Sequence, residues 1–197
     1  MRPALAGLLA ALACGPEAGP GPLPDAPARE PAVDASAGGV AVDAPVTADP
    51  DTAWTARIVA LAPTTGGVAT LRAVRAARHA GFDRVVWELS GPAPGVHVEY
   101  VDRPVRQCGS GNPVPLPGDA WLEVRLSPAV AHTEEGRPTM AERRAATGLP
   151  IVLEIVQTCD FEAVVAWALA ARSPERFRVA RLDAPTRVVV DLRHPAR

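Results

Sequence analysis

The sequence predicts an all-β fold, an antiparallel β-sandwich of short strands, over the region from about position 51 to position 197. Short runs of alternating or β-branched residues recur after position 80. Turn signals such as Gly91-Pro92, Pro117-Gly118 and Ala184-Pro185 separate many of these runs. The region has the length of one ordinary domain and shows no internal repeat, so a single domain at 51–197 is expected.

Six strands are predicted directly from these runs, at 84–89, 96–102, 121–126, 151–158, 177–182 and 187–192. Two further segments are ambiguous, because their apolar residues fit both periodicities. In FEAVVAWALAAR at 161–172, Phe161, Val164, Val165 and Leu169 have helical spacing, yet every second residue is also apolar. The segment 71–79 has the same ambiguity, and the local pattern alone predicts a helix in both.

The first fourteen residues, MRPALAGLLAALAC, have the pattern of a secretory signal: one early Arg, a short apolar run and small residues before a cysteine. The run is much shorter than the roughly 20 residues that span a bilayer. Residues 11–14 resemble a bacterial lipobox, although Leu12 stands two rather than three positions before the cysteine. We expect a lipoprotein signal peptide at 1–13 and a lipidated Cys14; the alternative is an ordinary signal peptide.

Residues 14–50 are expected to form a disordered linker after the lipidated cysteine. The stretch is rich in Pro, Ala, Gly and Asp and has no aromatic residue, so it cannot bury enough apolar area to offset the entropy of ordering. Its charge is one-sided, with acidic residues far outnumbering Arg29, whereas 51–197 is near neutral. As a flexible coil it would hold the domain about 30 Å from its anchor.

Cys108 and Cys159 remain once Cys14 is assigned to the lipid. An even pair in an exported domain is most simply a disulfide. The alternative is two unpaired buried thiols. A metal site is disfavoured, because neither cysteine has a second ligand at zinc-site spacing.

The stretch GFDRVVWELSG at 81–91 combines a buried strand with charged residues. Strand alternation places Val85, Trp87 and Leu89 on one face and Arg84, Val86 and Glu88 on the other. The charged face is either a solvated surface with a weak ion pair or an exposed strip that contacts a ligand.

Catalytic and nucleic-acid-binding patterns are missing from the sequence. It contains neither H-E-x-x-H nor G-x-S-x-G, and Gly109-Ser110-Gly111-Asn112 lacks the Lys of a phosphate-binding loop. His132 with Glu134 and Glu135 is an incomplete ligand set in a predicted loop. No basic run interleaved with aromatic residues is present. We therefore expect no enzyme activity, no cofactor, no metal and no nucleic-acid partner, with an envelope hydrolase as a remote alternative.

Two motifs carry a family resemblance: GFDRVV at 81–86 and APTRVVVDL at 184–192. With the segments between them, they resemble AMIN-like domains of bacterial cell-envelope proteins over roughly 67–194. The resemblance implies a non-catalytic β-sandwich that localises a protein to peptidoglycan, and it implies strands rather than helices at 71–79 and 161–172. The stretch 103–150 is longer than the family pattern and is expected to hold a short helix near 139–146.

The resemblance also implies roles for the charged residues. Asp83 and Arg84 would begin one strand, Arg187 would begin the last one, and these three with Asp191 would form a structural pair network; Arg84, Glu88 and Arg187 are also candidates for ligand binding. The expected protein is an exported, membrane-anchored envelope lipoprotein that binds peptidoglycan or a wall-associated protein. The alternative is a protein-interaction module in a secretin- or pilus-type assembly. Buried Trp87 and Trp121 would disfavour sugar stacking and favour a protein partner.

Overall fold

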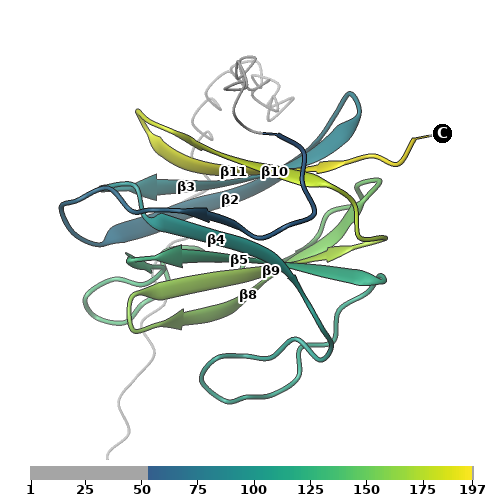
Figure 1. Cartoon of the computed structure of the whole chain (residues 1–197). Coiled ribbons are helices and arrows are strands. Elements are labelled where there is room, and N and C mark those ends of the chain that lie inside the picture. The colour runs from purple at the N-terminus through teal and green to yellow at the C-terminus, as the bar shows by residue number, and fades with distance from the viewer. Residues whose placement is uncertain (1–52, 197) are drawn as a thin grey trace, which may run out of the picture. The chain divides into compact units, whose positions relative to one another are not determined.

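The computed structural model describes residues 53–196, which fold into a sandwich of two β-sheets (Figure 1). The predicted signal peptide, Cys14 and the predicted linker at 14–50 lie outside the described residues. Every regular element in the described part is a strand, which confirms the predicted fold class. Within it, no helix is long and apolar enough to cross a membrane.

The first sheet has five strands in the order β10-β11-β3-β2-β6. Its three long strands are β2 (Ala69–His79), β3 (Phe82–Ser90) and β11 (Thr186–Arg193), with β10 (Phe177–Leu182) at one edge and the short β6 (Ala129–Val130) at the other. All neighbours are antiparallel except β2 and β6, which are parallel. The strand that carries the Asp-Arg pair is therefore the central strand of this sheet.

The second sheet has six strands in the order β1-β4-β5-β9-β8-β7, and all neighbours are antiparallel. Its strands are β1 (Val59–Leu61), β4 (Gly95–Val101), β5 (Ala120–Ser127), β7 (Arg144–Ala146), β8 (Val152–Phe161) and β9 (Val164–Ala171). In Figure 1 this sheet forms the lower layer, beneath the layer that contains β3 and β11.

The core lies between the two sheets and follows strand alternation. Val85, Trp87 and Leu89 of β3 are buried in it, as the period-2 pattern predicts, and they share one cluster with Trp167 and Leu169 of β9. Trp87 is 0% and Trp167 1% exposed, so the two largest side chains of the core are sealed from solvent. Burial of this interface supplies the main stabilising term of the sandwich.

The helices that the local pattern predicts at 71–79 and 161–172 are wrong, and the strands implied by the family resemblance are right. Residues 71–79 belong to β2, and 161–172 comprises the end of β8, a two-residue turn and β9. Glu162 and Ala163 have φ of 48° and 57°, as the central residues of a type I′ hairpin turn require. β9 is apolar at successive positions because both of its faces are buried, which the sequence alone cannot distinguish from a buried helix.

The short helix expected near 139–146 is also wrong. Arg144–Ala146 forms β7, which pairs with Val156–Glu154 at the edge of β8. The sequence there is rich in good helix formers, but helix propensity is a weak preference. Pairing with the otherwise unpaired edge of β8 satisfies backbone hydrogen bonds of both segments, and this favours a strand over a helix at 144–146.

The loop between β4 and β5, residues 102–119, folds over the outer side of the six-stranded sheet (Figure 1). Val105 and Val114 of this loop pack on Val156 and Ala168 of the sheet. A disulfide joins Cys108 to Cys159 of β8, and the Cys108 amide donates to the Thr158 carbonyl at 3.0 Å. The loop is thus an added layer with its own small apolar cluster, held by one covalent bond.

Replacing both cysteines by serine should lower the free energy of unfolding. The bond closes a loop with a sequence separation of 51, for which chain entropy predicts a loss of about 4 kcal/mol. Urea denaturation measures this change, and non-reducing mass spectrometry of exported protein should detect the linked peptide pair. Two freely alkylated thiols in exported protein would contradict the bond.

Candidate functional site

Asp83 lies on the inner side of β3 and joins the two sheets. Its side chain is 0% exposed and accepts hydrogen bonds from the backbone amides of Ile151 at 2.7 Å and Val152 at 3.0 Å, where β8 begins. Its other carboxylate oxygen lies 2.8 Å from Nε2 of His194. A buried carboxylate is stable only when such donors surround it, so Asp83 has a structural role at the sheet-to-sheet contact.

Arg84 points to the opposite side of β3, where it pairs with Asp191, its direct neighbour on β11. Nε of Arg84 lies 2.7 Å from Oδ1 and Nη2 lies 3.0 Å from Oδ2, which is a bidentate pair. Nε of Arg178 on β10 donates to the same carboxylate at 2.8 Å. Because the Arg84 side chain is 7% exposed and that of Asp191 3%, this ion-pair network ties three strands together and presents little surface.

Arg187 and Glu88 lie at the other end of the same face. They are direct neighbours on β11 and β3, and Glu88 forms an ion pair with Arg75 of β2 at 2.7 Å. The four residues expected to form one network are therefore divided: Arg84 contacts Asp191, Asp83 lies on the inner face, and Arg187 lies beside Glu88.

Aromatic rings surround the cationic end of this face. Guanidinium groups stack on these rings: the Arg178 guanidinium carbon lies 4.7 Å from the ring centroid of Trp54 and 5.0 Å from that of Phe82. His79 stacks on Phe82 at 4.9 Å, and the Arg193 guanidinium lies 5.9 Å from Trp54. Such cation–π contacts hold the guanidinium groups in fixed positions.

We call the outer side of the five-stranded sheet the arginine face. Strand register places on it Arg75, Arg84, Arg178, Arg187 and Arg193, with Glu88 and Asp191 as the acidic residues of the same strands. Arg75 and Arg193 are exposed and Arg187 is partly exposed. The face is a positively charged surface whose central charges are fixed by burial and whose outer charges reach solvent.

Of the four tryptophans in the described part, two are buried and two are partly exposed with an arginine against the ring. Trp87 and Trp167 are buried. The Trp121 ring is covered by the Arg103 guanidinium at 3.9 Å, and the Trp54 ring contacts Arg178. Sugar stacking is thus excluded at Trp87 and Trp167, whereas Trp54 and Trp121 are partly exposed.

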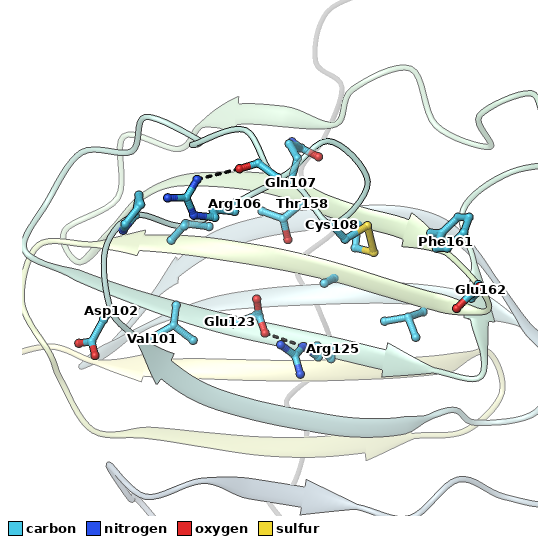
Figure 2. A pocket seen from close by; sticks show the side chains of 16 residues that line it. Val101, Asp102, Arg106, Gln107, Cys108, Glu123, Arg125, Thr158, Phe161 and Glu162 are labelled. Carbon is cyan, nitrogen blue, oxygen red and sulfur yellow. Dashed lines mark hydrogen bonds and ion pairs between the residues drawn. A yellow bond between two sulfur atoms is a disulfide. The ribbon is translucent and has the colours of Figure 1, made fainter.

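A groove of about 650 Å³ lies on the opposite sheet, between the loop 102–119 and the outer side of β5, β8 and β9. Figure 2 shows Asp102 at one end, Phe161 and Glu162 at the other, and an ion pair between Glu123 and Arg125 in the middle. The Arg125 Nε lies 2.6 Å from Oε1 of Glu123. The Cys108–Cys159 disulfide forms part of the wall.

Histidine and acidic residues are not assembled into a metal site within residues 53–196, where no group of three potential ligands comes together. His132 contacts Asp160 through Nδ1 at 2.8 Å, and Glu135 pairs with Arg137 instead. The sequence neighbours His132, Glu134 and Glu135 thus do not converge on one point.

Sequence reasoning missed Arg75, Arg178 and Arg193 on the arginine face and Phe161 at the groove. The three arginines lie on β2, β10 and β11, and only the pairing of these strands with β3 places them on one surface. Phe161 is 59% exposed, but helical spacing had assigned its ring to a buried stripe. Strand alternation with Val165 and Trp167 would also place Phe161 on the buried face, and only the two-residue turn at Glu162 and Ala163, which pairs Phe161 with Val164, turns the ring outward.

The fold is an antiparallel β-sandwich with a positively charged outer face on one sheet. A family model for the AMIN-like domain matches residues 69–194, more than half of the chain, and the chain belongs to this family. No curated protein and no solved structure matches the chain significantly. AMIN-like domains are generally non-catalytic and indicate a bacterial cell-envelope protein that binds peptidoglycan or serves an envelope assembly.

Asp191→Ala should lower the free energy of unfolding by about 3–5 kcal/mol, because it leaves the buried guanidinium of Arg84 without its counter-charge. Arg84→Met should cost less, since Asp191 keeps its bond to Arg178. The double variant R84M/D191A should be destabilised by less than the sum of the two single losses, because the two side chains contact each other directly. Urea denaturation of the four proteins gives the coupling energy.

The matched control is the ion pair of Arg75 and Glu88, whose side chains are 60% and 30% exposed. Arg75→Ala should change stability by less than about 1 kcal/mol. Equal effects of Arg75→Ala and Asp191→Ala would contradict a special structural role for the buried pair.

Proposed function

We propose that this protein is a non-catalytic, lipid-anchored adaptor of the cell envelope that binds peptidoglycan through the arginine face. The observation that carries the proposal is the grouping of five arginines on the outer side of the AMIN-like sheet, opposed by two carboxylates. Peptidoglycan presents carboxylates on its peptide stems, and guanidinium groups bind carboxylates with charge-assisted, bidentate hydrogen bonds.

The architecture of the face supports this proposal. Arg84 donates both of its hydrogen bonds to Asp191. In this proposal it therefore orders the strands of the face and does not contact peptidoglycan. Arg75, Arg187 and Arg193 are the accessible contributors. Because their strands are tied together beneath them, the positive charges keep a fixed spacing, which lowers the entropy lost on binding a repeated anionic surface.

A protein partner is the second candidate; the burial of Trp87 favours it, although Trp121 is partly exposed. The one tryptophan beside the arginine face, Trp54, contacts Arg178 and Arg193, so this face offers mainly positive charge, which suits an acidic protein surface. In that case the same arginines would contact an acidic wall-associated protein, and the domain would localise an assembly rather than hold the wall itself.

Lipid anchoring is proposed from the sequence. Residues 1–13 would be removed, Cys14 would carry acyl chains, and residues up to 50 would form the tether. Each buried methylene of an acyl chain contributes about 0.8 kcal/mol to membrane attachment. The anchor would keep the domain near the membrane while the tether lets the arginine face reach the wall.

A chain that begins at Gly15 retains the complete domain and with it the arginine face. It should therefore sediment with purified sacculi at low salt. The bound fraction should fall between about 0.05 M and about 0.5 M salt, because the Debye length shortens and screens exposed charges. The triple variant R75A/R187A/R193A should lose most of the binding. The bound and free fractions are measured by gel densitometry at equal folded fraction.

The control is Arg137→Ala, which removes an exposed arginine outside the arginine face, with a side chain 76% exposed. It should bind as wild type does. Absence of sedimentation at low salt would end the case for direct wall binding and leave the acidic protein partner. A loss in Arg137→Ala as large as that in the triple variant would show that binding is not specific to the arginine face.

Cys14→Ala should release the protein from the membrane fraction of a bacterium that processes lipoproteins, whereas wild type should remain with the membrane. Fractionation followed by immunoblotting measures the distribution. Metabolic labelling with a fatty acid should mark wild type only. Identical fractionation and labelling of the two proteins would refute the anchor.

A further inference from the structure

We propose that the groove between the loop 102–119 and the six-stranded sheet binds a short stretch of a neutral oligosaccharide. The groove lies on the other sheet from the arginine face, so the inference does not depend on the proposed function. Its volume of about 650 Å³ falls in the range of small-molecule sites. The loop that forms one wall is held in place by the disulfide and by its own apolar cluster.

The exposed ring of Phe161 is the first feature that points to a sugar. It is one of the large apolar side chains that the described residues leave exposed, at 59%, and Figure 2 places it at one end of the groove. The electron-rich face of an aromatic ring attracts polarised C–H groups, which the flat side of a pyranose supplies. The type I′ turn at Glu162 and Ala163 fixes where this ring stands.

The turn is built from residues that do not favour it. Both central positions have positive φ without Gly or Asn, which costs about 1–2 kcal/mol per residue. Glycine at 162 would relieve this cost but would remove a carboxylate from the edge of the groove. A strained position that keeps a polar side chain at a concave surface is typical of a functional site.

The polar groups of the groove favour a neutral ligand with many hydroxyl groups. Three carboxylates line it, from Asp102, Glu123 and Glu162, together with the guanidinium groups of Arg106 and Arg125. Neither sign dominates, because Arg125 pairs with Glu123 and Arg106 donates to the Gly111 carbonyl at 2.8 Å. The groove thus contains both hydrogen-bond donors and acceptors, and a sugar hydroxyl can both donate and accept.

Thr158 adds a second polar observation. It lines the groove and is 2% exposed, and its hydroxyl has no hydrogen-bond partner among the described residues. A buried hydroxyl without a partner costs about 1–3 kcal/mol.

Chitotetraose and cellotetraose are the probes, because they share a β-1,4-linked pyranose backbone and carry no charge that the arginine face could bind. Isothermal titration of the chain beginning at Gly15, with each probe up to about 10 mM, should give a dissociation constant in the millimolar range or below. Tighter binding of chitotetraose would show that the groove reads the acetamido group. Equal binding would show that ring and hydroxyl contacts suffice.

Phe161→Ala should weaken binding by about tenfold, the value of one aromatic contact, and Arg125→Ala should weaken it to a similar extent. Both side chains are largely exposed, so the fold should persist, which thermal unfolding checks. Ile58→Ala is the matched control: Ile58 is an exposed apolar residue, at 60%, outside the groove. The variant R75A/R193A should also bind as wild type.

The proposal is overturned if neither probe gives a measurable titration, or if Phe161→Ala and Arg125→Ala bind as Ile58→Ala does. Loss of chitotetraose binding in Phe161→Ala with intact sedimentation on sacculi would separate this site from the arginine face. Loss of sedimentation in R75A/R187A/R193A with intact chitotetraose binding would show that each surface acts independently.

Discussion

The carboxylate of Asp83 is the contact on which the packing of the two sheets depends. It is fully buried at the end of the central strand β3, and it accepts two backbone amides where β8 of the other sheet begins. An apolar core is tolerant of sliding, because burial is non-directional, whereas a buried carboxylate must keep its donors within hydrogen-bond distance. The placement of one sheet over the other is thus set at Asp83, and His194 holds the chain end at the same point.

The next residue along β3 organises the opposite face. Because successive side chains of a strand point to opposite sides, Arg84 leaves the core and meets Asp191 on β11, which also binds Arg178 of β10. One dipeptide therefore uses its first charge to join the sheets and its second to join three strands. The accessible arginines lie on the strands that this buried network ties together. The residues that order the charged face are therefore different from those that are accessible to a ligand.

The two sheets use their outer sides differently. The five-stranded sheet leaves its outer side to arginines and to a small group of stacked rings. The six-stranded sheet covers part of its outer side with the loop 102–119, and the uncovered remainder becomes a groove. The covering loop explains why β9 is apolar on both faces and why its sequence resembles that of a buried helix. An envelope module with two such surfaces can present charge on one side and a concave polar surface on the other.

The sequence by itself determined the fold class, six of the strands, the alternation of β3 and the family, since period-2 patterns, turn residues and the motifs around Asp83 and Arg187 are local signals. Local spacing and propensity predicted the wrong secondary structure at 71–79, 139–146 and 161–172, because they are outweighed by pairing with strands that are distant in the chain; the family resemblance corrected the first and the last of these. Only the tertiary structure showed that Asp83 and Arg84 have partners on opposite faces of β3, that Arg84 pairs with Asp191, and that Phe161 lines a groove. The physical reason is that ion pairs and grooves join side chains from different strands, and register across a sheet is a property of the folded molecule.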